Sequence, residues 1–216
     1  MTVFSKNKND HLAHLRAVLL RCRKYDISLN PKKFIFAVEQ GKLLGFIVSS
    51  EGMIIDLERT QVIAKLPPPT SKQSMQSFLG QINFVRRFVP SFSEMVRPLQ
   101  NLIKKDTQYH WGPPENQDFN EIKKAIIDAP SLMSPNSSQD FTLYTFASDR
   151  SYAAVLTQKN AENNEVPIAF MSSAFKGVEL NYPVVDWQAY AVKGSQAFPI
   201  LSFEVKNQGH CSLPCR

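Results

Sequence analysis

Residues Ser71–Leu99 read SKQSMQSFLGQINFVRRFVPSFSEMVRPL and contain the clearest helical pattern in the chain. Apolar side chains recur at every third or fourth position, as they do on one face of an α-helix. They are Met75, Phe78, Leu79, Ile82, Val85 and Phe88. Ser71 is a suitable first cap, and Pro90 should end the helix because proline lacks an amide donor. A second helix is predicted from Ser93 towards Lys105.

Upstream of this stretch, short apolar runs alternate with turn residues. Phe34–Val38 is predicted to be a short strand, and Leu43–Val48 and Met53–Ile55 are predicted to form a β-hairpin across Ser49–Gly52. Asp56 can cap a helix that runs through Ala64. The three consecutive prolines at 67–69 should stop it and mark a linker.

Downstream, the apolar period changes from that of a helix to that of strands. An amphipathic helix is predicted around Phe119, Ile122, Ala125 and Ile126. Residues 141–146, 153–158 and 166–171 then favour three strands separated by polar turns, and residues 185–192 favour a helix. Three strands followed by a helix are typical of part of an α/β domain.

The formal charge of +6 is unevenly distributed along the 216 residues. It is +5 over residues 1–65 (11 basic, 6 acidic side chains), +4 over 66–110 (6 and 2) and −3 over 111–216 (8 and 11). The basic first half indicates either a nucleic-acid partner or a solvated basic face, and charge alone does not separate the two. No apolar run of about 18 residues and no secretory signal pattern is visible, so we expect an intracellular protein without a membrane partner.

The 22 residues FLGQINFVRRFVPSFSEMVRPL at 78–99 resemble the thumb of reverse transcriptases from gypsy-type LTR retrotransposons. SLNPKKFIF and KLLGFIVSSEGMIID resemble the end of the palm in that family. The ribonuclease H-like module of the family is resembled by YTFASDRSYAAVLTQKN and ELNYPVVDWQAYAVK. The amino-acid sequences of these two stretches are most similar to those of plant elements. The resemblance implies an α/β (α+β) chain, with a reverse-transcriptase palm remnant and helical thumb followed by a truncated ribonuclease H-like sheet.

The same resemblance implies a division of the chain into segments. Residues 1–55 would be the end of the palm with a primer-grip-like hairpin, and residues 56–110 the thumb. Residues 111–140 would be a connecting helix and linker, and residues 141–192 the first half of the ribonuclease H-like domain. The resemblance stops after Val192.

The resemblance also implies which residues contact an RNA–DNA or DNA template-primer. Leu44, Gly45 and Phe46 look like the primer grip. The thumb helix would contribute Gln73, Gln76, Asn83, Arg86 and Arg87, whose amide and charged groups suit sequence-independent contact with sugar-phosphate. The alternative is that both arginines are solvated helix charges. No small-molecule substrate is expected.

Catalytic residues are not expected in this chain. In the family, a Tyr-x-Asp-Asp turn holds the magnesium ions of the polymerase, and residues 1–6 resemble the segment that follows this turn. The ribonuclease H ligands of the family are an Asp in a Thr-Asp-Ala-Ser run and a helical Glu. Here Phe146 and Gln188 stand at these positions. We therefore expect no catalytic residues, metal or cofactor, and Asp149 and Asp186 to be surface residues.

Three functions are compatible with these features. The first is an inactive polyprotein fragment with residual template-primer binding. The second is a domesticated nucleic-acid-binding or interaction protein, and the third is an enzyme subunit completed by a palm on another chain. Salt-sensitive, sequence-independent binding would distinguish the second from an inert fragment.

Residues 193–216 have no clear period and form a divergent tail. Back-translation of 197–204 in a shifted frame can give His-Phe-Arg-Ser-Tyr-Leu-Leu, which resembles the continuation of the family. A frame-shifted tail is therefore a hypothesis that sequencing of the locus tests. His210, Cys211 and Cys215 could share a metal, but the four ligands of a zinc site are lacking, so none is expected.

Overall fold

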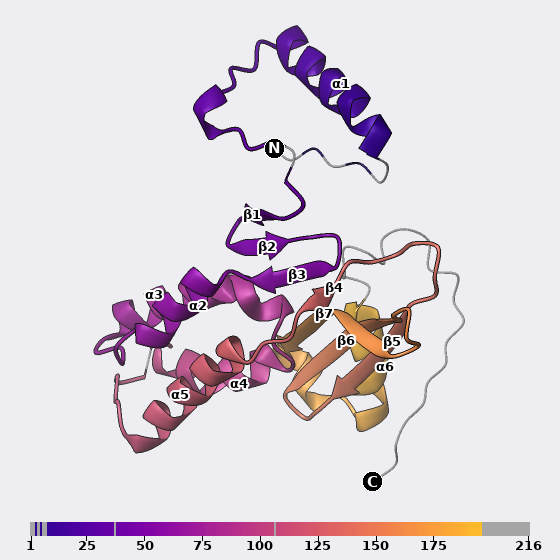
Figure 1. The fold of residues 1–216 in the computed structure, drawn as a ribbon. Coiled ribbons are helices and arrows are strands. Elements are labelled where there is room, and N and C mark those ends of the chain that lie inside the picture. Colours follow the sequence, from indigo (N-terminus) through magenta and orange to yellow (C-terminus); the bar gives the residue numbers. More distant parts are fainter. Residues whose placement is uncertain (1–2, 4, 6–7, 37, 106, 196–216) are drawn as a thin grey trace. The chain divides into compact units, whose positions relative to one another are not determined.

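The computed structural model describes residues 3, 5, 8–36, 38–105 and 107–195. The chain consists of two compact units, Met1–Val38 and Glu39–Arg216, and each is described by itself. Figure 1 shows the elements in chain order. The predictions for the tail beyond residue 195 lie outside the described residues, as does most of the segment 1–6.

The first unit contains the helix α1, His11–Lys24, between the short 3₁₀ turns η1, Lys8–Asp10, and η2, Pro31–Lys33. Cys22 is its buried apolar residue, whereas Leu12 is 75% exposed. The strand predicted at 34–38 is wrong for residues 34–36 and 38, which have no strand pairing. A strand requires a partner for its backbone groups, and the described residues of this unit contain no other strand.

The second unit begins with an antiparallel sheet of order β1-β2-β3-β4. Its strands are Gly41–Leu43, Phe46–Val48, Gly52–Ile55 and Leu132–Met133. The predicted hairpin across Ser49–Gly52 is confirmed as β2–β3. The single strand predicted at 43–48 is wrong, because the chain reverses at Leu44 and Gly45, whose φ angles are +52° and +89°. Such a two-residue left-handed turn joins β1 to β2.

Four helices and one 3₁₀ segment pack beside this sheet. They are α2, Leu57–Lys65; α3, Lys72–Ile82; η3, Asn83–Arg87; α4, Phe92–Leu102; and α5, Pro113–Ile127. The helical pattern predicted from Ser71 is confirmed, although its last turn tightens into η3. Met75, Ile82, Leu99 and Ile122 are completely buried in the core that these helices share with Ile55 and Leu132. None of the described helices is both long and apolar enough to cross a bilayer.

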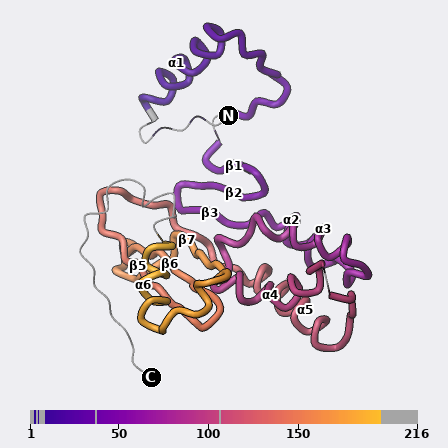
Figure 2. The backbone as a smooth tube through the Cα atoms, turned by 180° about the vertical axis from the view of Figure 1, so that it is seen from behind, coloured from indigo at the N-terminus to yellow at the C-terminus, as the bar shows by residue number. Residues whose placement is uncertain are grey.

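A second antiparallel sheet of order β5-β6-β7 follows, with strands Thr142–Ala147, Ser151–Lys159 and Glu165–Ala174. The three predicted strands and the following helix are therefore confirmed. The 3₁₀ turn η4, Gly177–Asn181, leads into α6, Val184–Ser195, which lies against one face of the sheet (Figures 1 and 2). Tyr152 on β6 contacts Tyr190 on α6 edge to face, with ring centroids 5.7 Å apart.

Candidate nucleic-acid interface

Helix α3 carries Gln73 and Gln76, and the following η3 segment carries the other predicted contact residues of the thumb. The Ser71 side chain accepts the amide of Ser74 at 3.2 Å, and the Ser74 side chain accepts the amide of Ser71 at 3.0 Å. This reciprocal cap satisfies donors that would otherwise lack a partner at the helix start. Met75, Phe78 and Ile82 point into the core. Because these side chains fix the rotation of the helix, its opposite side faces solvent.

An amide row lies on that solvent side and consists of Gln73, Gln76 and Asn83, with Gly80 between them. All four residues are exposed, and their spacing of three or four positions places them on one helical face. A Cβ built on Gly80 would meet no atom within 4 Å. The three amide side chains form no hydrogen bond with any described residue, so their donors and acceptors are available to a ligand.

The two predicted arginines of η3 differ in their surroundings. The Nη2 atom of Arg86 donates a hydrogen bond to the backbone oxygen of Ser172 at 2.7 Å. Arg87 is half-buried and makes no hydrogen bond or ion pair within the described part of the chain. Consecutive residues of a helical segment point about 100–120° apart. The two guanidinium groups therefore point towards different sides of η3.

The β1–β2 turn presents Leu44 at its tip, where 83% of the residue is exposed. Gly45 follows in a left-handed conformation, and its oxygen accepts the amide of Asp56 at 3.1 Å. A methyl group on Gly45 would lie 2.7 Å from Arg59 Nε. Only glycine combines this φ angle with such a close approach.

Phe46 connects this turn to η3 and to the residue that follows it. Its ring centroid is 5.5 Å from that of Phe84 and 5.2 Å from that of Phe88. The Arg59 guanidinium lies over the Phe84 ring, 4.7 Å from its centroid. The primer-grip-like turn and the segment that carries Asn83 and Arg87 are therefore joined by one aromatic cluster. Arg59 and Phe84 were missed by the sequence analysis, because no periodic signal links α2 to η3.

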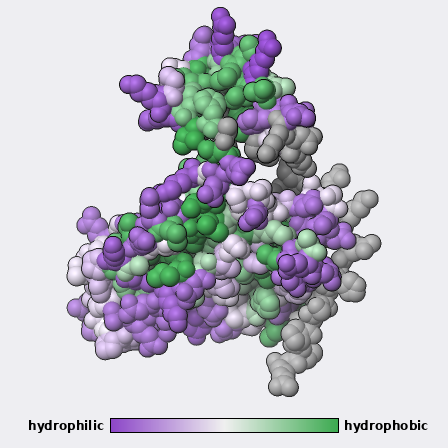
Figure 3. Space-filling model, viewed as in Figure 1, coloured by the Kyte–Doolittle hydropathy of each residue, from purple (hydrophilic) through white to green (hydrophobic). Residues whose placement is uncertain are grey.

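Several basic side chains of the second unit are engaged within the chain. Lys42 forms ion pairs with Glu58 at 2.9 Å and Asp56 at 3.2 Å, and these hydrogen bonds raise the pKa of Lys42. Lys72 Nζ donates to the backbone oxygen of Lys104 at 2.6 Å, just beyond the end of α4. The formal charge therefore overstates the number of cations available to a polyanion. Figure 3 also shows apolar surface over the β1–β3 and α2 region, where Ile54 and Leu57 are exposed.

The two positions predicted to be degenerate ribonuclease H ligands, Phe146 and Gln188, do not converge. Ala147 pairs with Tyr152, which contacts α6, so strand alternation places Phe146 on the face away from α6. Phe146 is 56% exposed, and Gln188 lies on α6 itself. A phenyl group offers no ligand atom and Gln188 offers a neutral amide, so these residues do not fit a magnesium pair. Asp149 is exposed and pairs with Arg150 at 3.3 Å.

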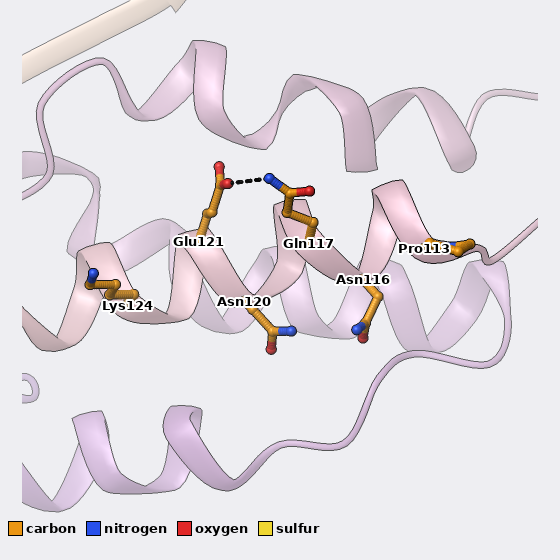
Figure 4. Close-up of a pocket in the computed structure, with 6 residues that line it drawn as sticks. All are labelled: Pro113, Asn116, Gln117, Asn120, Glu121 and Lys124. Carbon is orange, nitrogen blue, oxygen red and sulfur yellow. Dashed lines mark hydrogen bonds between the residues drawn. The ribbon is translucent and has the colours of Figure 1, made fainter.

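No group of three or more His, Cys, Asp or Glu side chains within the described ranges is arranged to hold a metal. The surface of α5 contains a shallow depression (Figure 4). The side chains that line it all come from this one helix: Pro113, Asn116, Gln117, Asn120, Glu121 and Lys124. Gln117 donates to Glu121 at 2.9 Å. A depression formed by a single helix does not enclose a small molecule.

Comparison with known proteins relates this arrangement to retroelements. Residues 111–197 match the family described as the RNase H-like domain found in reverse transcriptase. The Transposon Tf2-3 and Tf2-4 polyproteins of Schizosaccharomyces pombe are each 30% identical over 190 residues, which cover 88% of this chain and 14% of each polyprotein. The chain thus spans a small part of the length of these relatives.

Two solved structures show the same fold. The foamy viral protease-reverse transcriptase dRH in complex with ds DNA has a TM-score of 0.73 and 24% identity, covering 91% of this chain and 35% of that one. The foamy viral protease-reverse transcriptase in complex with an RNA/DNA hybrid has a TM-score of 0.73 and 23% identity, covering 91% and 27%. The predicted mixed helix-and-sheet fold is confirmed. Over most of its length the chain is therefore similar to a segment of these transposon polyproteins, and residues 111–197 match the RNase H-like domain found in reverse transcriptase.

Proposed function

We propose that this chain binds a nucleic-acid duplex of the template-primer type, RNA–DNA or DNA, through the amide row and Arg87. The observation that carries the proposal is the position of these side chains, which line the solvent side of α3 and η3 and have no partner within the described residues. Amide and guanidinium groups hold sugar and phosphate oxygens without reading bases. The expected binding is therefore independent of sequence and sensitive to salt.

The β1–β2 turn would supply a second contact. Leu44 is the exposed apolar group at its tip, Gly45 shapes the turn, and Phe46 anchors it to Phe84 and Phe88. Because the aromatic cluster joins the turn to η3, the two contacts would be held near each other. The foamy viral proteins of the same fold were solved with ds DNA and with an RNA/DNA hybrid, which supports a duplex as the ligand.

We further propose that the chain has no catalytic activity and needs no metal cofactor of its own. The support is the chemistry of Phe146 and Gln188, which cannot replace two carboxylates around a pair of magnesium ions. Assignment to a gypsy-type element of plants is also a proposal. It is supported by the amino-acid sequences of residues 144–160 and 179–193, which resemble those of plant elements. The relatives named above are fungal.

The test is binding of the purified chain to a labelled RNA–DNA template-primer across a salt series. Arg87→Ala should lower the slope of log affinity against log salt by about 0.9, the value for one lost phosphate contact. Lys124→Ala is the matched control, because it removes one positive charge from the exposed surface of α5 and should leave the slope unchanged. Equal slopes for wild type and Arg87→Ala, or no binding by folded protein at low salt, would refute the proposed interface.

A further inference from the structure

Ser172 on β7 joins the second sheet to the helices through two different atoms. Its backbone oxygen accepts Nη2 of Arg86 at 2.7 Å, and its Oγ accepts the backbone amide of Ser93 at 2.8 Å. The residue is only 2% exposed. Both bonds span about eighty positions of sequence, so they are tertiary contacts between η3, α4 and the sheet.

The bond to Ser93 replaces a missing local cap. Ser91 stands at the start of α4 with a φ angle of +49° and makes no side-chain cap bond. The first amides of a helix have no partner within the helix. Ser172 Oγ therefore caps α4 from another element, and this fixes the position of β7 against the start of α4.

The neighbouring residues of β7 extend the same contact. Phe170 lies two positions before Ser172 and so on the same side of the strand, and it packs against the large helical core. Glu94, one position after Ser93, accepts a weaker bond from Ser151 on β6 at 3.5 Å. Arg86 thus completes a contact surface that joins η3 and α4 to two strands of the second sheet.

We propose that Arg86 and Arg87 have divided roles: Arg86 is a positioning residue that holds the β5–β7 sheet against the thumb helices, and Arg87 binds phosphate. The assignment of Arg87 rests on the proposed function above, whereas that of Arg86 rests on its bond to Ser172. Loss of Arg86 should loosen β7 and the first turn of α4. It should leave the number of phosphate contacts unchanged.

Two readouts on the full chain separate these roles. The first is amide hydrogen exchange of β7 and of residues 92–95. The second is the salt slope of binding to the labelled RNA–DNA template-primer. In Arg86→Ala, exchange in both segments should rise by about tenfold, because one charge-assisted hydrogen bond no longer opposes local opening. The salt slope should stay that of wild type. In Arg87→Ala, the salt slope should fall by about 0.9, and exchange in both segments should stay that of wild type.

Arg86→Gln separates the charge of Arg86 from its hydrogen bond. It removes the charge and leaves a shorter amide donor, so exchange should lie between that of Arg86→Ala and that of wild type, at an unchanged slope. If Arg86→Ala fails to fold, both readouts can be measured on Arg86→Gln instead. A slope lowered by about 0.9 in either Arg86 variant would overturn the division of roles, whatever the exchange data show. Unchanged exchange in Arg86→Ala would overturn the positioning role. If wild type does not bind, the proposed function fails while exchange still tests Arg86.

Discussion

Replacement of Ser172 by alanine removes a cap that β7 supplies to α4. The amide of the half-buried Ser93 would lose its 2.8 Å bond to the Oγ atom of Ser172, a residue that is only 2% exposed. The bond from Arg86 would persist, because its acceptor is a backbone oxygen. Loss of a helix cap costs about 1 kcal/mol, and an unsatisfied buried donor costs about 1–3 kcal/mol. These are two descriptions of one lost bond, so we expect a loss of about 1–2 kcal/mol.

Urea unfolding of wild type and Ser172→Ala measures this difference directly. The midpoint should fall with little change in the denaturant slope, because the surface exposed on unfolding is nearly the same. Thermal unfolding should shift by about 2–4 °C for each kcal/mol in a chain of this size. Hydrogen exchange at the Ser93 amide should accelerate as well, since that donor has lost its partner.

Ser173→Ala is the matched control for Ser172→Ala. Ser173 is the next residue of β7, pairs with Tyr152, and makes no side-chain hydrogen bond within the described residues. Its replacement should change stability by no more than about 0.5 kcal/mol. Equal destabilisation by the two variants would show that loss of any serine from β7 matters, and that Ser172 Oγ does not cap α4. Unchanged exchange at Ser93 would refute the cap independently.

Three further outcomes follow from the structure. Gly45→Ala should destabilise the chain by about 1–2 kcal/mol, because φ is +89° and the new methyl group would displace Arg59; unchanged urea unfolding would contradict this. Leu99→Ala should cost about 2–5 kcal/mol because Leu99 is completely buried; a loss below 1 kcal/mol, on the order of a surface substitution, would contradict its place in the core. The hydrogen bond from the Tyr190 hydroxyl lowers the pKa of Glu179, so this carboxylate stabilises the fold above pH 4.5 and loses that contribution as the pH falls below 4.5. Glu179→Gln should therefore reduce the decrease of the unfolding free energy with falling pH in this acidic range. An unchanged decrease would refute the assignment.

The helices and strands were largely predictable because their signals are local. Ser71 and the apolar side chains after it define α3 through a cap and a repeat, both of which operate within a few turns of one helix. The strands of the second sheet were predictable from the alternation of apolar residues between polar turns. The turn at Leu44 and Gly45 was missed because a leucine with positive φ is rare, although a glycine inside an apolar run is a known sign of a break.

Local sequence patterns predict the order of elements, the core faces of the helices, and the residue types at the positions that resemble the family. The resemblance also predicts that Phe146 stands where the family has a metal ligand, because that comparison needs only the aligned sequences. The sequence by itself could not separate Arg86 from Arg87, which are adjacent and chemically identical. Only the tertiary structure brings Ser172 to Arg86 and Ser93, because these bonds join groups about eighty residues apart that no local periodicity relates. Long-range contacts depend on how whole elements pack, and this packing decides which side chains face the core, a partner strand or solvent.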